Sequence, residues 1–282
     1  MAKEVTKLIH KYLRHDKKFP HVWCPGCGNG IVLGALIRAI DALGVEKDEI
    51  VLASGIGCSS RMPVYVDFNT LHTTHGRALT FATGVKLAKP SLTVITVMGD
   101  GDATAIGGNH LIHAARRNLD MTAIIINNQI YGMTGGQHSP TTPYGSYTTT
   151  SYYGNIEHAF SIAELTVTAG APFVARGSVY HAEPLATLIK QAIRKRGFSV
   201  VEVMSTCPVH FGRQNEMGDP VAMMQWLKEH AVTTKKAEQM SPDALKGKFT
   251  IGVLADVEKP LYTKEYQQIR KRAKALLKES KK

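Results

Sequence analysis

The chain has 282 residues and carries 34 Lys and Arg against 23 Asp and Glu, a formal charge of +11. With 44% hydrophobic and 20% charged residues, 25 glycines and 12 prolines, its composition is that of a globular protein and excludes a disordered, collagen-like or coiled-coil chain. No apolar stretch approaches the roughly 20 residues of a membrane-spanning helix. The charged opening MAKEVTKLIHKYLRHDKK lacks a signal-peptide core, so we expect a cytoplasmic protein.

Apolar periodicity predicts alternating helices and strands along the chain. In order, they are a helix over 31–43, a strand over 49–55, a helix over 76–88, a strand over 91–99, a helix running to about Arg117, a strand over 121–127, a helix over 155–170, a strand at PFVARG, a helix at EPLATLIKQAIRKRG and a strand over 198–204. This alternation predicts an α/β fold, a mostly parallel sheet with helices on both faces. Functional loops should then gather at the carboxyl ends of the strands.

Two stretches depart from this alternation. Residues 128–154, NQIYGMTGGQHSPTTPYGSYTTTSYYG, have little apolar periodicity and predict a long loop. Loops of that length in a compact domain are usually functional lids or disordered. After residue 212 the pattern weakens into polar helices joined by Ser-Pro and Gly segments. We therefore expect one domain over residues 1–212 and a helical, basic C-terminal arm over 213–282.

Positive charge is concentrated at the end of that arm. The last twelve residues, KRAKALLKESKK, hold six basic residues and one acid, which leaves +6 for the rest of the chain. No basic run interleaved with aromatics is present, and there is no helix-turn-helix or zinc-finger spacing, so nucleic-acid binding is not predicted. A basic tail is usually a solvated surface, and docking of an anionic partner is the functional alternative.

Each cysteine lies beside glycine or proline, in WCPGCGNG, SGIGCSSR and STCPVHFG. These cysteines are Cys24, Cys27, Cys58 and Cys207. Without a signal peptide they are not expected to form disulfides. The first two form a C-x-x-C motif, which alone fits redox chemistry, zinc or an iron–sulfur cluster. Four cysteines suit a zinc site and a cubane cluster equally.

The segment Gly99-Asp100-Gly101-Asp102 lies where a predicted strand turns into a helix, a place where backbone N–H groups bind phosphate oxygens. It is not a G-x-G-x-x-G dinucleotide fingerprint, because Thr104 stands where the third glycine would be. An acid in a phosphate loop would repel diphosphate unless a divalent cation bridges them, so Asp100 is predicted to be a Mg²⁺ ligand. Asn128, after the strand over 121–127, is the expected partner ligand. Two unrelated turns are the alternative interpretation.

The spacing from GDG to the double asparagine resembles the thiamine diphosphate signature of thiamine enzymes. Moreover, WCPGCGNG, GIGCSSR, THGRALTFATGVKLA, GDGDATAIGGNHLIHAARRN and NNQIYGMTGGQHSPTTP together resemble the β subunit of 2-oxoacid:ferredoxin oxidoreductases, above all its 2-oxoglutarate branch. The resemblance covers about residues 20 to 215. It implies a thiamine-diphosphate-binding fold that carries the diphosphate-binding half of the site and one [4Fe–4S] cluster.

The resemblance also implies the roles of individual residues. The cluster ligands would be Cys24, Cys27, Cys58 and Cys207, and Mg²⁺ would be held by Asp100, Asn128 and the carbonyl of Ile130. Thiamine diphosphate would be contacted by Ile56, Gly57, Cys58, Ser59, His75, Gly101, Asp102, Gly132 and Met133. Arg61 would face the substrate carboxylate. The alternatives are a capping or packed imidazole for His75 and an ordinary surface arginine for Arg61.

The implied reaction is oxidative decarboxylation of 2-oxoglutarate with coenzyme A to succinyl-CoA and CO₂, with electrons passing through the cluster to ferredoxin. Pyruvate and branched-chain 2-oxoacids are alternative substrates. An activating glutamate would come from the pyrimidine-binding domain of an α subunit, so an αβ heterodimer, doubled to (αβ)₂, is expected. The rival functions are a non-catalytic four-cysteine zinc or electron-transfer module and a thiamine carboligase or decarboxylase. Neither nucleic acid nor a membrane is an expected partner.

Overall fold

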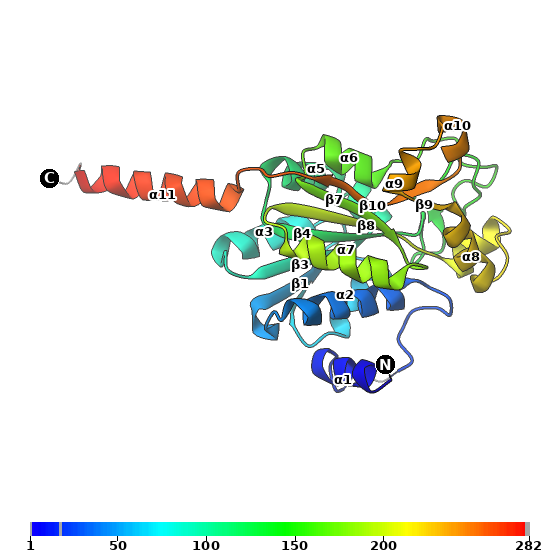
Figure 1. The fold of residues 1–282 in the computed structure, drawn as a ribbon, viewed down its shortest axis with the longest axis horizontal. Helices are drawn as coiled ribbons and strands as arrows, with labels where there is room; N and C mark the ends of the chain where they lie inside the picture. The colour runs from blue at the N-terminus through cyan, green and yellow to red at the C-terminus, as the bar shows by residue number, and fades with distance from the viewer. Residues whose placement is uncertain (1, 17–18, 280–282) are drawn as a thin grey trace.

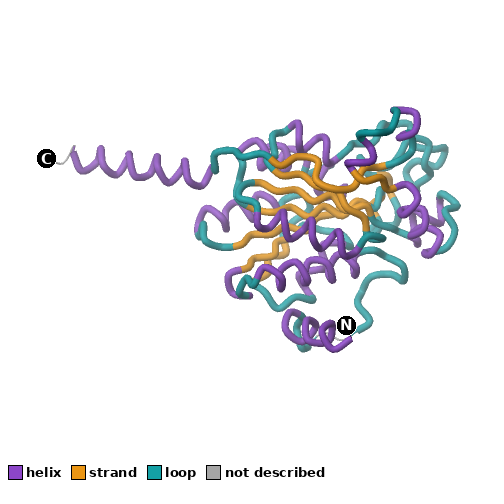
Figure 2. The backbone as a smooth tube through the Cα atoms, viewed as in Figure 1, coloured by secondary structure: helices purple, strands orange, loops and turns teal. Residues whose placement is uncertain are grey.

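The computed structural model describes residues 2–16 and 19–279. Within them, eight strands form one sheet in the order β2-β1-β3-β4-β8-β7-β10-β9 (Figures 1 and 2). Neighbouring strands from β2 to β7 are parallel, whereas β10 runs antiparallel to β7. The strands are β1 Ile50–Ser54, β2 Asn69–His72, β3 Thr93–Gly99, β4 Met121–Asn127, β7 Phe173–Ser178, β8 Phe198–Met204, β9 Ala231–Thr233 and β10 Phe249–Asp256.

Helices cover both faces of the sheet, as predicted, and produce two apolar cores (Figure 1). One core joins the sheet to α2 (Asn29–Leu43) and α7 (Ala182–Arg194), and the other joins it to α3 (Ala78–Ala88), α5 (Gly108–Arg117) and α6 (Ile162–Thr168). Successive strand residues point to opposite faces. Both faces of the central strands β4 and β8 are covered, so both strands are buried along their whole length and are mostly apolar.

One predicted helix is much shorter than its sequence pattern suggested. Residues 155–170 were expected to be helical, but α6 spans only Ile162–Thr168. The side-chain amide of Asn155 donates to the carbonyls of Thr142, Pro143 and Glu157, which holds the preceding segment as a loop. The Ser161 hydroxyl then caps the helix by accepting from the backbone N–H of Glu164.

The region beyond residue 212 is not purely helical, so that part of the prediction is wrong. It contains α8 (Pro220–His230), β9, α9 (Thr234–Ala237), α10 (Pro242–Leu245), β10 and α11 (Tyr262–Glu279). Residues 249–256 pair with β7 and extend the sheet, because the free edge of β7 offers backbone partners to this strand. Only α11 projects from the body as an arm in the described part of the chain (Figure 1).

Several short elements had no clear sequence signal. They are α1 (Ala2–Tyr12), β2, α4 (Asp100–Thr104), the hairpin of β5 (Ile130–Tyr131) and β6 (Gln137–His138), the 3₁₀ turns 47–49 and 59–64, and a π-helical turn over 208–212. Across the described residues, no helix has both the length and the apolarity to cross a bilayer.

Candidate active site

Four loops meet at the carboxyl edge of the sheet. They follow β1, β3, β4 and β8, which lie side by side in the sheet order. Parallel strands deliver their carboxyl ends to the same edge, so loops that are far apart in sequence come together there. Two cavities open among these loops, one of about 440 Å³ and one of about 250 Å³.

The larger cavity collects the residues expected to hold a diphosphate and a divalent cation. Its volume is within the range of about 300–1,000 Å³ typical of small-molecule sites. Its walls include Ile56, Gly57, Cys58, Ser59, His75, Asp100, Gly101, Asp102, Asn128, Ile130, Gly132 and Met133. Gln137, His138 and Thr150, from the long loop after β4, line it as well.

Asp102 lines this cavity and contacts the loops that carry Ile56 and Gly76. Its Oδ1 accepts hydrogen bonds from the backbone N–H groups of Gly76 (2.6 Å) and Ile56 (3.4 Å) and lies 2.9 Å from Nδ1 of His75. A Cβ on Gly55 would lie 2.1 Å from Oδ2 of Asp102, so glycine is required for this approach. Burial raises the pKa of Asp102, and the Gly76 N–H opposes this shift by stabilising the carboxylate. Asp102 therefore positions the loops that line the cavity.

Asp100, Asn128 and Ile130 bring three oxygens together. As placed, the side-chain oxygen of Asn128 lies 3.0 Å from Oδ1 of Asp100 and 2.8 Å from the carbonyl oxygen of Ile130. Rotating the amide would replace these oxygen contacts with two hydrogen bonds. Adjacent ligands of an octahedral Mg²⁺ with bonds of 2.0–2.1 Å lie about 2.9 Å apart. Both contacts made by the Asn128 side chain have about this length, so Asp100, Asn128 and Ile130 lie close enough together to share a small, hard cation.

Two hydroxyl groups that no sequence motif indicated hold Asp100. Ser139 and Thr141 donate hydrogen bonds of 2.6 and 2.5 Å to its Oδ2, and both side chains are buried. Because these donors occupy Oδ2, Oδ1 remains to face Asn128. Asp100 is 2% exposed, and burial raises its pKa to about 6 although the two hydroxyls favour the charged form. Nothing in the SPTT sequence distinguishes it from an ordinary turn.

Tyr131 was also missed, and it explains a glycine of the GDGD segment. The Tyr131 hydroxyl donates to the carbonyl of Gly101 at 3.1 Å, and a Cβ on Gly101 would lie 2.4 Å from the Tyr131 ring. Burial, with the nearby carboxylates of Asp100 and Asp102, raises the pKa of Tyr131 to about 12. The phenol is therefore neutral and acts as a donor to the backbone of the loop.

All four cysteines line the smaller cavity. Sγ of Cys207 and Sγ of Cys58 lie 3.5 and 3.7 Å from the place that a Cβ on Gly132 would occupy. The Cys24–Cys27 turn is joined to the Cys58 loop by Trp23, whose indole N–H donates to the carbonyl of Cys58 at 2.7 Å. Burial and the neighbouring thiols raise the pKa of Cys58 to about 11.

The two cavities share walls. Cys58, Asn128, Gly132 and Met133 line both of them. Among the described residues, no group of three or more His, Cys, Asp or Glu side chains is arranged to hold a single metal ion. Arg61 lines the cysteine cavity and is absent from the walls of the larger one, and its positive charge slightly opposes the rise in the pKa of Cys58.

Comparison with known proteins gives consistent matches. The family model "Thiamine pyrophosphate enzyme, C-terminal TPP binding domain" matches residues 55–203. The 2-oxoglutarate synthase subunit KorB of Methanothermobacter marburgensis is 54% identical to this chain, and the match covers 89% of this chain and 87% of that subunit. The subunit of the same name from Methanocaldococcus jannaschii is 47% identical, over 94% of this chain and 98% of its own length. A 2-oxoglutarate:ferredoxin oxidoreductase from Magnetococcus marinus, solved with 2-oxoglutarate, coenzyme A and succinyl-CoA bound, is similar with a TM-score of 0.83 at 33% identity, covering 94% of this chain and 90% of the solved one.

Proposed function

Because this chain belongs to the β-subunit family of 2-oxoacid:ferredoxin oxidoreductases, we propose that it oxidises 2-oxoglutarate with coenzyme A to succinyl-CoA and CO₂ when joined to its α subunit. One observation carries this proposal: the diphosphate-type cavity and the four-cysteine cavity share Cys58, Asn128, Gly132 and Met133. Such an arrangement fits two cofactors that exchange electrons, and it is not required by a decarboxylase or carboligase.

In this proposal the larger cavity holds thiamine diphosphate and Mg²⁺. Asp100 through Oδ1, Asn128 through its side-chain oxygen and Ile130 through its carbonyl are the protein ligands of the metal, which fits the contacts of 3.0 and 2.8 Å that the Asn128 side chain makes with the other two. When bound, thiamine diphosphate supplies the electron sink for decarboxylation. The protein positions the diphosphate at the start of α4, and Asp102 fixes the loops that carry Ile56 and His75.

The smaller cavity, in the same proposal, holds a [4Fe–4S] cluster on Cys24, Cys27, Cys58 and Cys207. A cavity of about 250 Å³ lined by four thiols leaves room for a cluster, whereas one Zn²⁺ would draw the sulfurs to about 2.3 Å from a common point. Burial raises the pKa values of Cys27 and Cys207 as well as that of Cys58. These thiols must lose protons when they bind iron, so cluster assembly releases protons.

In the same proposal, a partner subunit supplies the other half of the thiamine site. The family match is to one thiamine-binding domain over residues 55–203, and the relatives are themselves named as subunits. A pyrimidine-binding domain with its activating glutamate would come from the α subunit, in an αβ pair that doubles to (αβ)₂. Electrons would leave the cluster for ferredoxin.

The test compares the reconstituted αβ complex on 2-oxoglutarate, pyruvate and 2-oxoisovalerate, together with an Arg61→Gln variant. We expect 2-oxoglutarate to give the highest kcat/KM. If Arg61 binds the substrate carboxylate, its loss should raise the KM for each 2-oxoacid by about tenfold or more, because a charge-assisted hydrogen bond is lost, and should leave the KM for coenzyme A unchanged.

Two results would count against these assignments. If pyruvate or 2-oxoisovalerate gave the highest kcat/KM, that 2-oxoacid would replace 2-oxoglutarate as the proposed substrate. An Arg61→Gln enzyme with unchanged KM values but a shifted cluster reduction potential would move Arg61 from substrate binding to the cluster, in keeping with its place in the cysteine cavity.

A second prediction concerns the two hydroxyls on Asp100. The double variant Ser139→Ala/Thr141→Val should weaken divalent-cation binding by about 10–100-fold, the usual cost of removing groups that orient a metal ligand. Mn²⁺ binding to the chain with thiamine diphosphate, followed by electron paramagnetic resonance, measures this directly. Thr149→Val, an exposed change in the same loop, is the matched control. Equal Mn²⁺ affinity in all three proteins would rule out this role for the hydroxyls.

A further inference from the structure

One stretch of the long loop exposes an unusual number of large apolar side chains. Within residues 144–160, which we call the aromatic segment, Tyr153 is 95% exposed, Ile156 81% and Tyr152 79%. Tyr144, Tyr147 and Phe160 are exposed as well. Single exposed apolar residues are normal on a protein surface, but a concentration of them marks an interaction site.

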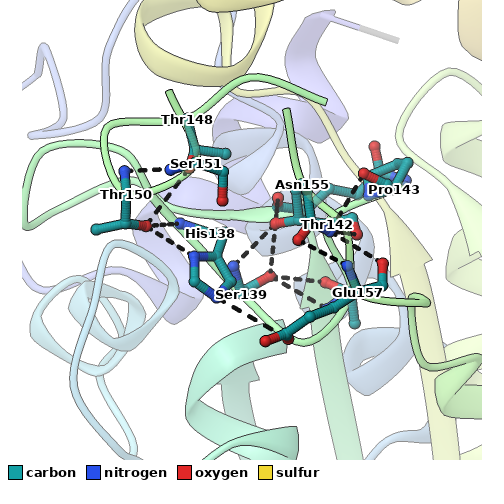
Figure 3. Close-up of polar contacts among 11 residues, drawn as sticks. His138, Ser139, Thr142, Pro143, Thr148, Thr150, Ser151, Asn155 and Glu157 are labelled. Carbon is teal, nitrogen blue, oxygen red and sulfur yellow. Dashed lines mark hydrogen bonds and ion pairs between the residues drawn. The ribbon is translucent and has the colours of Figure 1, made fainter. Parts of the chain in front are cut away.

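The backbone of the aromatic segment is held firmly. Gly145 N–H donates to the carbonyl of Asn155 at 2.7 Å, and Asn155 N–H donates to that of Ser146 at 2.8 Å. Asn155 also bridges to Thr142 and Pro143 through its side-chain amide (Figure 3). Because these bonds already order the backbone, the segment has little backbone entropy left to lose on binding.

A second anchor joins the aromatic segment to another part of the chain. Asn215 accepts from the backbone N–H of Tyr147 at 2.8 Å and donates through its side-chain amide to the Tyr147 carbonyl at 3.0 Å. Residue 215 follows the π-helical turn after Cys207. The segment is therefore fixed relative to the cysteine loop as well as to the loop after β4.

The segment is continuous with the wall of the larger cavity. His138 and Thr150 line that cavity, and Nδ1 of His138 lies 2.8 Å from the Thr150 hydroxyl (Figure 3). Just before the segment, Ser139 and Thr141 hold Asp100. A protein that completes this cavity from outside must pass close to the exposed tyrosines.

The chemistry of the segment indicates what kind of surface it meets. Its sequence, YGSYTTTSYYGNIEHAF, contains no Lys or Arg in a chain of net charge +11. An acidic electron carrier would be drawn to the basic parts of the molecule and not to this tyrosine-rich surface, whose one charged side chain is that of Glu157. Tyrosine is enriched where protein interfaces are buried, and its rigid ring loses little freedom there.

We propose that the aromatic segment is the docking surface for the partner subunit, with Tyr152 and Tyr153 as its central contacts. This inference rests on the proposed function in one respect, namely that a partner carries the other half of the thiamine site. The matching surface of that partner is apolar and weakly charged. Docking there would place the partner against the same loop that orients Asp100.

The experiment uses the co-purified αβ complex with a Tyr152→Ser/Tyr153→Ser chain. The heterodimer dissociation constant, measured by dilution in sedimentation velocity, should rise by about tenfold or more, as for truncation of central interface aromatics. Iron content and the thermal transition of the chain should stay unchanged, because the two rings pack on each other and otherwise face outward. Val221→Ser, which alters a 74% exposed residue on α8, is the matched control.

Heterodimer affinity equal to that of the wild-type complex would overturn the inference. So would weaker self-association of this chain with unchanged αβ affinity, because the segment would then meet a second copy. A loss confined to electron transfer to ferredoxin would likewise reject the α subunit as the occupant. The αβ dissociation constant is measured without turnover, so it tests the docking surface separately from the reaction. A wild-type αβ complex that forms but does not oxidise 2-oxoacids would contradict the proposed function alone.

Discussion

Cys58→Ser is expected to abolish coupled 2-oxoacid oxidation while leaving the thiamine cavity able to bind its cofactor. Cys58 is the one cysteine that lines both cavities in the described residues, and its pKa of about 11 as a free thiol shows how strongly its surroundings favour the protonated form in the absence of metal. Ferredoxin-linked turnover should fall by more than about 100-fold, since even groups that only orient a metal ligand cost about 10–100-fold.

Three measurements on the anaerobically purified complex separate the possible readings of Cys58→Ser. Iron and acid-labile sulfide should drop, the brown absorbance should bleach, and binding of thiamine diphosphate with Mg²⁺ should persist. Ser60→Ala is the control, because this neighbouring buried hydroxyl makes no hydrogen bond among the described residues. Stoichiometric zinc without iron in the wild-type protein would favour the non-catalytic metal module, and full activity of Cys58→Ser would favour a carboligase or decarboxylase.

Asp100→Asn should have an effect of comparable size at the other cofactor. It keeps the side-chain shape but removes the negative charge that a divalent cation needs, so Mg²⁺-dependent binding of thiamine diphosphate should weaken by about 100-fold or more. Calorimetric titration of the chain with thiamine diphosphate at fixed Mg²⁺ measures the change. Thr96→Val on β3, the strand that leads into Asp100, is the control, since that buried hydroxyl has no partner among the described residues.

Stability provides an independent readout for the same variant. Burial raises the pKa of Asp100 from 3.8 in the unfolded chain to about 6, so the wild-type cofactor-free chain loses stability as the pH rises between those values. The asparagine variant has no such charge. Its thermal transition should therefore exceed that of the wild type above pH 6, and the difference should shrink as the pH falls below 6. A lower transition for Asp100→Asn at pH 7.5 would show that the carboxylate supports the fold.

Much of the architecture follows from local pattern alone. The helices ending at Leu43 and Ala88 and the strands beginning at Met121 and Phe198 lie where apolar periodicity predicts them, because central elements are buried and their residue pattern must match the face they cover. The expected meeting of the loops after β1, β3, β4 and β8 at one sheet edge is confirmed, because strand direction in a parallel sheet determines which loops meet.

Other features depend on contacts between distant parts of the chain. The segment 155–161 has helical apolar spacing, yet Asn155 holds it as a loop by bonds to carbonyls twelve and thirteen residues earlier. Phe249–Asp256 becomes a strand because β7 leaves an edge to pair with, which no local propensity reveals. Tertiary partners override weak local preference in both places.

Some features of the candidate site can be predicted from the sequence, whereas others depend on the fold. Motif spacing alone placed Asp100 and Asn128 together and singled out the four cysteines, because the chemistry of metal binding restricts which residue types can serve. Only the folded chain brings Ser139 and Thr141 onto Asp100, joins both cavities at Cys58 and exposes Tyr152 and Tyr153 on the loop whose Thr150 lines the larger cavity. Hydroxyl and aromatic groups occur throughout any sequence, and it is their neighbours in space that decide whether they orient a ligand, pack in a core or meet another protein.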